Sequence, residues 1–275
     1  MHPLQSNPTT PIVLSIAGSD SGGGAGIQAD LKTISATGSY ACSVITAITA
    51  QNTLGVSAVY PVPREQVSSQ LEAVFSDIHI DVVKIGMLAE ASIIEAVSEK
   101  IAHYKPKYVV LDPVLVSSSG KYLLNPKAIS CLKDRLIPLV DLLTPNLPES
   151  VCLTGGGSPN FNPDITQLGE DLLALGATSV LLKGGHMEER DRSCDWLFHH
   201  GKIEQYCSKR VMTKNSHGTG CTLSSAISSY LAQGYPLTEA VRRAKAYLFK
   251  ALKTSDALKI GHGTGPLNHF HTLTV

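Results

Sequence analysis

Short apolar runs rich in β-branched residues recur along the chain, and between them apolar residues fall three or four positions apart. The first pattern is typical of buried strands and the second of helices with one buried face. We expect strands at 12–17, 42–49, 56–62, 82–85, 108–111, 139–143 and 179–183, and helices through 27–34, 67–75, 94–101, 165–175, 223–231 and 241–252. This alternation predicts an α/β fold with a mostly parallel central sheet and helices on both faces.

The last third of the chain adds a different element to this rhythm. Two further runs, 195–198 and 203–211, are separated around Gly201 and predict an antiparallel hairpin at the edge of the sheet. No internal repeat, low-complexity segment or linker interrupts the sequence. We therefore expect a single domain spanning 1–275, with 1–11 flexible.

A glycine-rich stretch near the C-terminal end, 214–222, leads straight into one of the predicted helices. Gly218 and Gly220 allow the backbone to bend, so that unpaired N–H groups of the first helical turn can point at a ligand. Those donors and the positive end of the helix dipole suit a phosphate group. A lone Gly-x-Gly is equally compatible with an ordinary loop before an ordinary helix, so the anion-binding interpretation depends on the residues that accompany it.

A second glycine loop, 18–26, follows the first predicted strand and opens the first predicted helix. It does not match the dinucleotide-binding pattern Gly-x-Gly-x-x-Gly, because Ile27 stands three residues after Gly24. The chain also lacks the Gly-x4-Gly-Lys-Ser/Thr motif of P-loop proteins. Nicotinamide cofactors and P-loop chemistry are therefore disfavoured.

Residues suited to ligand binding collect where the predicted strands end. Open parallel sheets bind ligands in the crevice beyond the carboxyl ends of their strands. The residues at those positions are Asp20, Gln51, Met87, Asp112, Asn146, Glu149 and Lys183. Taken singly, Asp112 and Asp30 could be helix caps or solvated charges and Lys183 could lie at the surface. The shared position at strand ends is what predicts a binding site.

Composition and charge narrow the class of partner. The 275 residues carry 23 basic and 23 acidic side chains, so the formal net charge is zero, and like charges do not form long runs. This balance does not suggest nucleic acid or an anionic membrane surface, and we expect a small-molecule ligand. The polar N-terminal residues and the lack of a long apolar stretch predict a soluble, cytosolic protein.

The cysteines are widely scattered, at Cys42, Cys131, Cys152, Cys194, Cys207 and Cys221. They form no Cys-x-x-Cys pair and have no matched histidine spacing. The sequence therefore predicts neither a disulfide framework nor a zinc site, and most of the cysteines are expected to be small, buried packing residues.

Several motifs, taken together, resemble a known kinase family. They are 17–31 (AGSDSGGGAGIQADL), 46–53 (TAITAQNT), 84–87 (KIGM), 111–114 (LDPV), Asn146-x-x-Glu149 and 217–222 (HGTGCT). With them the chain, from about 12 to its 261–269 tail, resembles the ribokinase-like superfamily, and within it the bacterial hydroxymethylpyrimidine/phosphomethylpyrimidine kinases of thiamin biosynthesis. The resemblance implies ATP, Mg²⁺ and a homodimer. It also implies phosphorylation of 4-amino-5-hydroxymethyl-2-methylpyrimidine and then of its monophosphate.

The resemblance assigns the nucleotide and metal side of the site to particular residues, and each role has a physical reason. N–H donors to the transferring phosphoryl group are expected at His217, Gly218, Thr219 and Gly220. Lys183 would neutralise phosphate oxygens. Asp112 and Glu149, with the ATP-binding residue Asn146, would hold Mg²⁺ mainly through its waters, because this ion prefers oxygen ligands and keeps its hydration shell.

The resemblance likewise assigns the residues around the pyrimidine. The Asp30 carboxylate would accept from the exocyclic amine, and the Gln51 carboxamide would both donate and accept, which orients the ring. Gly18, Met87 and Val114 would line its flat faces.

Cys221 stands where the sugar kinases of this fold carry an aspartate as the base. The hydroxymethylpyrimidine kinases share the cysteine, and a thiol whose pKa is lowered by a helix N-terminus can accept the proton of an alcohol. In a loose transition state that proton leaves late, so a weak base suffices. Two other interpretations remain open, a nucleophile activated by His217 and a small packing residue.

Two alternatives to this function follow from the same residues. A pyridoxine or pyridoxal kinase of the same subfamily would also act on a hydroxymethyl group carried by a flat nitrogen ring. A catalytically silent nucleotide-binding regulator would require a broken anion loop or missing carboxylates, and neither is found in the sequence.

One anion loop and one carboxylate pair predict that both phosphorylations occur at one site, with 21–26 accommodating the additional phosphate.

Overall fold

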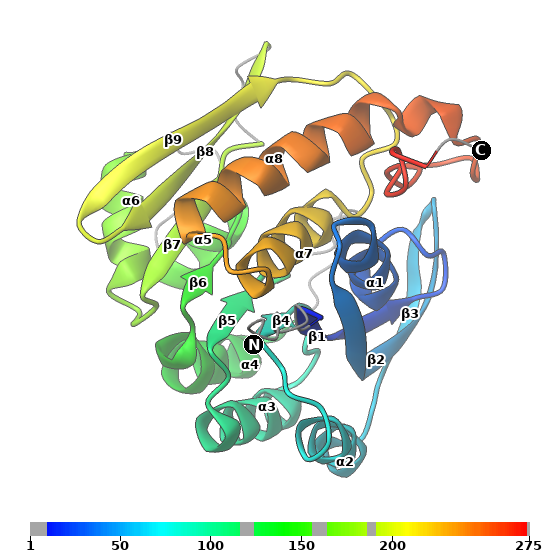
Figure 1. Ribbon diagram of the computed structural model, residues 1–275. Helices are drawn as coiled ribbons and strands as arrows, with labels where there is room; N and C mark the ends of the chain where they lie inside the picture. The colour runs from blue at the N-terminus through cyan, green and yellow to red at the C-terminus, as the bar shows by residue number, and fades with distance from the viewer. Residues whose placement is uncertain (1–9, 116–123, 156–163, 186–190, 274–275) are drawn as a thin grey trace, which may run out of the picture.

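A nine-stranded sheet forms the centre of the protein in a computed structural model that describes residues 10–115, 124–155, 164–185 and 191–273. Its strands are ordered β3-β2-β1-β4-β5-β6-β7-β8-β9 (Figure 1). They span β1 (Ile12–Asp20), β2 (Tyr40–Asn52), β3 (Gly55–Pro61), β4 (Val82–Ile85), β5 (Tyr108–Leu111), β6 (Leu142–Leu143), β7 (Ser179–Lys183), β8 (Arg192–His199) and β9 (Lys202–Lys209). The six strands from β2 to β7 in this order are parallel, and the edge strands β3, β8 and β9 are antiparallel. The predicted mostly parallel sheet and edge hairpin are confirmed.

Helices cover both faces of this sheet, as the sequence predicted (Figure 1). They are α1 (Gly26–Ala36), α2 (Arg64–Phe75), α3 (Ala91–Tyr104), α4 (Pro126–Cys131), α5 (Leu147–Thr154), α6 (Ile165–Leu173), α7 (Thr219–Ala232) and α8 (Leu237–Lys253). Apolar side chains of α2 to α6 form one buried cluster against the sheet, and those of α1, α7 and α8 form a second. Successive strand residues point to opposite faces, so Val13 belongs to the second cluster and Leu14 to the first.

Two short helices were not predicted. α4 begins after Asn125, whose side chain accepts from the Ala128 N–H at 2.9 Å, and a π-helical turn at Leu132–Leu136 continues it. α5 begins after Asn146. Both helices have too few residues for a helical periodicity to stand out in the sequence. The predicted strand 139–143 is likewise reduced to β6, because a 3₁₀ turn at Ile137–Leu139 precedes it.

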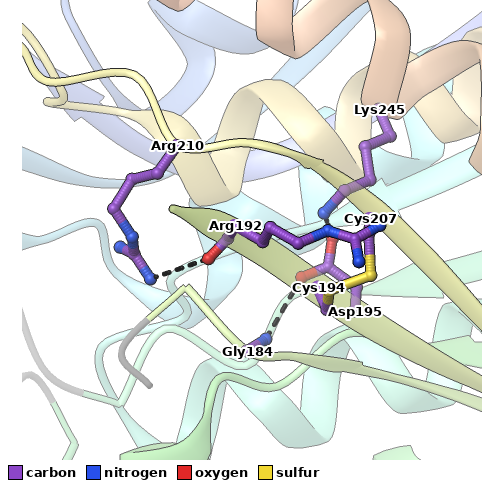
Figure 2. The surroundings of a disulfide bond; sticks show 7 residues. All are labelled: Gly184, Arg192, Cys194, Asp195, Cys207, Arg210 and Lys245. Atoms are coloured by element: carbon purple, nitrogen blue, oxygen red, sulfur yellow. Dashed lines mark hydrogen bonds and ion pairs between the residues drawn. A yellow bond between two sulfur atoms is a disulfide. The ribbon is translucent and has the colours of Figure 1, made fainter. Parts of the chain in front are cut away.

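A disulfide between Cys194 and Cys207 corrects the prediction that the cysteines stay unpaired. β8 and β9 place these residues directly opposite each other, with Cα atoms 4.1 Å apart (Figure 2). Short-range spacing rules miss such a pair because the partners are brought together by hairpin register over 13 residues. The other cysteines, Cys42, Cys131, Cys152 and Cys221, are free and partly buried.

The segment that follows α8 folds back over the loops at the carboxyl end of the sheet. The Thr264 N–H donates to the Thr53 carbonyl at 2.9 Å, and the His217 N–H donates to the Gly265 carbonyl at 3.0 Å. The segment thereby ties the β2–β3 turn to the loop before α7. In the described part of the chain, no helix combines the length and apolarity needed to cross a membrane.

His269 anchors this segment on the first turn of α7 and is expected to make stability depend on pH. Its Nε2 lies 3.0 Å from the Thr222 hydroxyl, and the Tyr247 hydroxyl donates to its carbonyl at 2.6 Å. Burial lowers the pKa of His269 to about 4, so the folded protein keeps the imidazole neutral while the unfolded chain takes up a proton near pH 6.5. The stabilisation is therefore complete above about pH 6.5 and is lost as the pH falls towards 4.

We expect the free energy of unfolding to decrease by roughly 2 kcal/mol between about pH 7.5 and about pH 5 from this group alone. Denaturant unfolding of the parent and of His269→Gln measures it, because glutamine can still bond to Thr222 but does not titrate. The same pH dependence in both proteins would contradict the assignment.

Candidate active site

A cavity of about 920 Å³ opens at the carboxyl ends of the parallel strands, where the sequence predicted a site. All the predicted site residues except Asp30 contribute to its lining, namely Gly18, Gln51, Met87, Asp112, Val114, Asn146, Glu149, Lys183, His217, Gly218, Thr219, Gly220 and Cys221. Segments from both halves of the chain thus meet around one space large enough for two small molecules.

The two glycine loops pack against each other backbone to backbone at one end of this cavity. A Cβ atom added to Gly218, whose φ is +85°, would lie 1.9 Å from the Gly24 carbonyl oxygen. A Cβ added to Gly24 would lie 2.6 Å from Cδ2 of His217. Glycine is therefore needed at both positions because the loops touch, which local sequence could not indicate.

Asp20 organises the first glycine loop and joins it to the second. Its carboxylate accepts from the N–H groups of Gly22, Gly24 and Ala25 at 2.8, 3.0 and 2.9 Å. It also lies 2.9 Å from Nε2 of His217. Burial raises the pKa of Asp20, but His217 and the backbone donors outweigh it and leave the pKa below its ordinary value. The carboxylate therefore stays charged and holds the loop shape.

His217 does not have the predicted role of a phosphate donor. Its imidazole is directed at Asp20 and lies 3.1 Å from the Gln51 amide, and its backbone N–H is used by the Gly265 carbonyl. The N–H groups of Gly218, Gly220 and Cys221 have no acceptor within the described residues, whereas that of Thr219 makes a long bond of 3.4 Å to Ser216. The donors available to an anion therefore lie at the N-terminus of α7 itself.

Lys183 and Asp112 form an ion pair of 2.7 Å beside these donors. A Cβ added to Gly220 would lie 3.2 Å from Nζ of Lys183 and 3.3 Å from the Asp112 carboxylate, so the pair borders the loop directly. Burial lowers the pKa of Lys183, but Asp112 and Glu149 raise it by more, and the ammonium stays charged. A fixed positive charge thus faces the place where the N–H donors converge.

Glu149 and Asn146 form the capping box that starts α5. The Asn146 side chain accepts from the Glu149 N–H, and the Glu149 carboxylate accepts from the Asn146 N–H, each at 2.9 Å. Burial raises the pKa of Glu149, opposed by nearby Lys183. A divalent cation would favour the charged carboxylate and so relieve this penalty.

The oxygen donors of Asp112 and Glu149 fit Mg²⁺. This ion is usually held by one or two carboxylates together with substrate phosphates and waters rather than by a cage of protein ligands. In keeping with that, the described residues contain no group of three or more side chains arranged to hold a metal without a substrate.

An apolar wall lies at the inner part of the cavity. Gly18 faces Met87 so closely that an added Cβ would lie 2.5 Å from the methionine methyl group. Met87 packs with Ala47, Ala89 and the partly buried Val114 in a small cluster of its own. The Gln51 carboxamide at the end of β2 accepts from the Thr49 hydroxyl at 3.1 Å. A flat apolar surface beside one carboxamide suits a small polar ring.

Asp30 lies behind the cavity rather than facing a ligand, which corrects the predicted placement. Its fully buried carboxylate forms an ion pair with Lys84 at 2.8 Å and accepts from the hydroxyls of Ser15 and Ser225. Lys84 from β4 lines the cavity in its place. The helical position of Asp30 was predicted, but whether it reaches the ligand depends on the strand packed beneath α1. A lysine inside the apolar run 82–85 was the available signal for Lys84.

Cys221 lines the cavity in the first turn of α7, where the base was predicted. Enclosure between the loops raises the pKa of its thiol to about 11, although Lys84 lowers it. The expected lowering of this pKa is therefore wrong for the ligand-free protein, because loss of hydration outweighs the helix N-terminus. The imidazole of His217 is directed elsewhere, so a nucleophilic Cys–His pair receives no support.

The outer part of the cavity combines an apolar wall with a polar one. Val211, Met212, Leu248, Phe249 and Leu252 supply the apolar side. On the polar side, the Lys245 ammonium lies 2.5 Å from the Asp195 carboxylate, which also accepts from the Gly184 N–H at 3.1 Å (Figure 2). Lys245, Leu248, Phe249 and Leu252 were missed as site residues because α8 reads as an ordinary amphipathic helix. Val211 and Met212 follow β9 and belong to no motif that marks a site.

Comparison with known proteins agrees with this geometry. A family model described as phosphomethylpyrimidine kinase matches residues 20–268. The chain belongs to this family. It is 49% identical over 258 residues to the hydroxymethylpyrimidine/phosphomethylpyrimidine kinase of Escherichia coli, covering 94% of this chain and 97% of that relative.

Two solved structures are also similar. The phosphomethylpyrimidine kinase of Clostridium difficile is 48% identical with a TM-score of 0.77, over 88% of this chain and 99% of that chain. The pyridoxal kinase of Staphylococcus aureus, in complex with AMP-PCP and pyridoxal, is 34% identical with a TM-score of 0.86, over 95% of this chain and 94% of that chain. The protein is therefore a kinase with the ribokinase-like fold implied by its motifs.

Proposed function

We propose that the protein uses ATP to phosphorylate 4-amino-5-hydroxymethyl-2-methylpyrimidine and then its monophosphate, in thiamin biosynthesis. The observation that carries the proposal is the N-terminus of α7, where N–H donors that have no acceptor among the described residues lie beside the Asp112–Lys183 pair and the Cys221 thiol. Family membership supports the same reaction. Anion donors and a fixed cation are what phosphoryl transfer requires, because its transition state carries charge on oxygen.

In this proposal the two parts of the cavity hold the two substrates. The apolar outer part would take the adenine and ribose of ATP, and its triphosphate would extend towards α7. The pyrimidine would lie on the wall of Gly18, Met87 and Val114, with its polar edge at Gln51. The hydroxymethyl group would then face both Cys221 and the donors of α7, which is the arrangement that transfer from ATP requires.

Mg²⁺ would be held by Asp112 and Glu149, with Asn146 keeping Glu149 in place through the capping box. When bound, the ion would neutralise charge on the phosphates of ATP. Lys183 would stabilise the transferring group from the other side, and Gly218 and Gly220 would donate to its oxygens. Cys221 would accept the alcohol proton late in the transfer, as its thiolate.

Both phosphorylations are proposed to occur in this one cavity. The second substrate differs from the first by a phosphate, and of the segment 21–26 proposed to accommodate it, Ala25 and Gly26 line the same cavity as the pyrimidine wall. A coupled assay of ADP release with the alcohol and with the monophosphate tests this, and activity on only one of them would overturn it.

A pyridoxal or pyridoxine kinase activity is the second candidate, and the likeness to the Staphylococcus aureus pyridoxal kinase favours testing it. Comparison of kcat/KM for the pyrimidine alcohol and for pyridoxal, at equal ATP, decides between the two substrate classes.

Gln51→Leu is expected to weaken binding of the pyrimidine alcohol by on the order of 1 to 3 kcal/mol while leaving ATP binding nearly unchanged. The reason is that leucine would leave the polar edge of the ring without a partner. Calorimetry with each ligand measures both affinities. Gln51→Glu is the matched control, since it keeps the shape and the acceptor but removes the donor, and equal weakening of both ligands would instead indicate a general defect of the site.

A homodimer is proposed through the edge of the sheet formed by β2 and β3. Ile48 and Tyr60 are 59 and 78% exposed and lie directly opposite each other across the two strands, and Leu54 in the turn between them is 72% exposed. Exposed apolar residues gathered in this way are typical of an interface between subunits. Sedimentation velocity measures the association state. The cytosolic location stays a prediction.

A further inference from the structure

A buried ion pair lies beneath the reacting end of the cavity, and the proposed chemistry above leaves it without a role. Lys84 on β4 and Asp30 on α1 are both fully buried, and Nζ of Lys84 lies 2.9 and 2.8 Å from the two carboxylate oxygens. An ion pair this deep loses the hydration of two charges, so its retention calls for an explanation beyond stability.

The surroundings hold this pair in one orientation. Asp30 also accepts from the Ser15 hydroxyl on β1 at 2.6 Å and from the Ser225 hydroxyl on α7 at 2.7 Å. Side chains from three other elements, β1, β4 and α7, therefore converge on this carboxylate of α1, and each of its oxygens accepts two hydrogen bonds. The Lys84 ammonium is thus fixed by two hydrogen bonds to a carboxylate that is itself held in place.

Lys84 keeps one donor for the cavity. Two of its three N–H groups are accounted for by Asp30, and the third has no acceptor within the described residues. Lys84 belongs to the cavity lining, and a Cβ added to Gly86, which also lines the cavity, would lie 3.0 Å from Nζ of Lys84. Cys221 lines the same cavity, one helical turn before Ser225 and hence on the same face of α7. Because Asp30 bonds both to Lys84 and to Ser225 of α7, it brings the third N–H of Lys84 to the face of α7 that carries the Cys221 thiol.

We propose that Lys84, held by Asp30, is the fixed counter-charge for the Cys221 thiolate and so a positioning residue for proton transfer from the alcohol. The inference rests on the proposed function for its catalytic meaning, but the state of the thiol can be measured without any kinase reaction. Apart from Lys84 and the Gly26 N–H, which both lower the pKa of the Cys221 thiol, its surroundings disfavour the thiolate. A base must be deprotonated before it can accept a proton.

The other charges around Cys221 are consistent with this role. Lys84 lowers the pKa of the thiol, whereas Asp30 on α1 and Asp112 after β5 raise it. Lys183 on β7 is the other nearby cation, and it is already paired with Asp112 at 2.7 Å. Lys183 is thus engaged with a proposed Mg²⁺ ligand, whereas the partner of Lys84 is Asp30, which is not a proposed metal ligand.

The test is the pH dependence of Cys221 alkylation by iodoacetamide in the ligand-free protein, followed peptide by peptide with mass spectrometry. Three proteins are compared with the parent, Lys84→Met, Asp30→Asn, and the double variant Lys84→Met/Asp30→Asn, which removes both charges without leaving either unpaired. Cys42 serves as the internal reference, because burial also raises its pKa to about 11 but Lys84 is not among the groups acting on it.

Opposite effects on the rate of Cys221 alkylation are expected from the double variant and from Asp30→Asn. The double variant should alkylate Cys221 about tenfold more slowly at about pH 8, which corresponds to a rise of about one pH unit in the midpoint. Asp30→Asn should alkylate it faster, because the repelling carboxylate is gone and Lys84 remains. Alkylation of Cys42 should not change in either protein.

Unchanged Cys221 alkylation in a folded double variant, or slower alkylation in Asp30→Asn, would overturn the proposal. Lys84→Met leaves the buried Asp30 carboxylate without its counter-charge. If this variant does not fold for that reason, Asp30→Asn and the double variant still test the proposal. Because alkylation needs neither ATP nor the pyrimidine, its outcome is separate from that of the kinase assays. In those assays the double variant should lower kcat about tenfold and leave the KM for ATP unchanged.

Discussion

Replacement of Cys221 by alanine is expected to lower kcat by roughly two to four orders of magnitude, the range for loss of a positioned general base. The KM for ATP should change little, because the Cys221 N–H at the start of α7 is retained and only the thiol is lost. Steady-state kinetics with the pyrimidine alcohol and with its monophosphate measure the effect. A parallel loss in both reactions is expected, since one cavity contains one such thiol.

Cys131→Ala is the matched control for this experiment. Cys131 is also a free, partly buried cysteine, but it lies at the end of α4 and outside the cavity lining. Its replacement should leave kcat unchanged. Near-normal turnover in Cys221→Ala would reassign Cys221 to packing, and loss of only one of the two reactions would mean that they use separate bases.

Gly218→Ala is expected to reduce kcat/KM by about a hundredfold or more, although no functional group is removed. The added methyl would lie 1.9 Å from the Gly24 carbonyl oxygen, and the φ of +85° is unfavourable for alanine. The two glycine loops must therefore move apart, and a displacement of about 1 Å at a site of phosphoryl transfer can itself cause a loss of that size. We also expect a lower stability, by roughly 2 to 4 kcal/mol from strain and overpacking together.

Gly234→Ala separates these causes. Gly234 follows α7 with a φ of +88°, but an added Cβ there would have no atom within 4 Å. Its replacement should lower stability by only about 1 kcal/mol and leave kcat/KM unchanged. Equal effects of the two substitutions in thermal unfolding and in kinetics would show that backbone conformation, rather than contact between the loops, accounts for the loss.

Local patterns determined much of the fold. The apolar runs that became β1, β4, β5 and β7 and the helical spacing of α7 and α8 were sufficient to predict a mostly parallel sheet covered on both faces. These features can be predicted because residues on one face of a strand or helix repeat at a fixed period. The position of the cavity followed as well, since parallel strands all end at one edge of the sheet.

Of the residues that the sequence predicted for the site, all but one meet at the cavity. Gln51, Asp112 and Lys183 were placed at strand ends by the same local patterns, and each lines the cavity. Asp30 is the exception, because a helical position does not specify whether a side chain points into a cavity or into the packing beneath it.

Tertiary structure alone decided how these residues are used. The contact between Gly24 and Gly218 and the direction of the His217 ring towards Asp20 both join segments whose relative placement depends on packing of the whole sheet. The pairing of Cys194 with Cys207 depends on the register of the β8–β9 hairpin. The raised pKa of Cys221 has the same origin, because hydration of a thiol depends on what encloses it. A sequence specifies periodicity within an element, whereas side-chain direction, burial and charge pairing arise only when elements far apart in the chain come into contact.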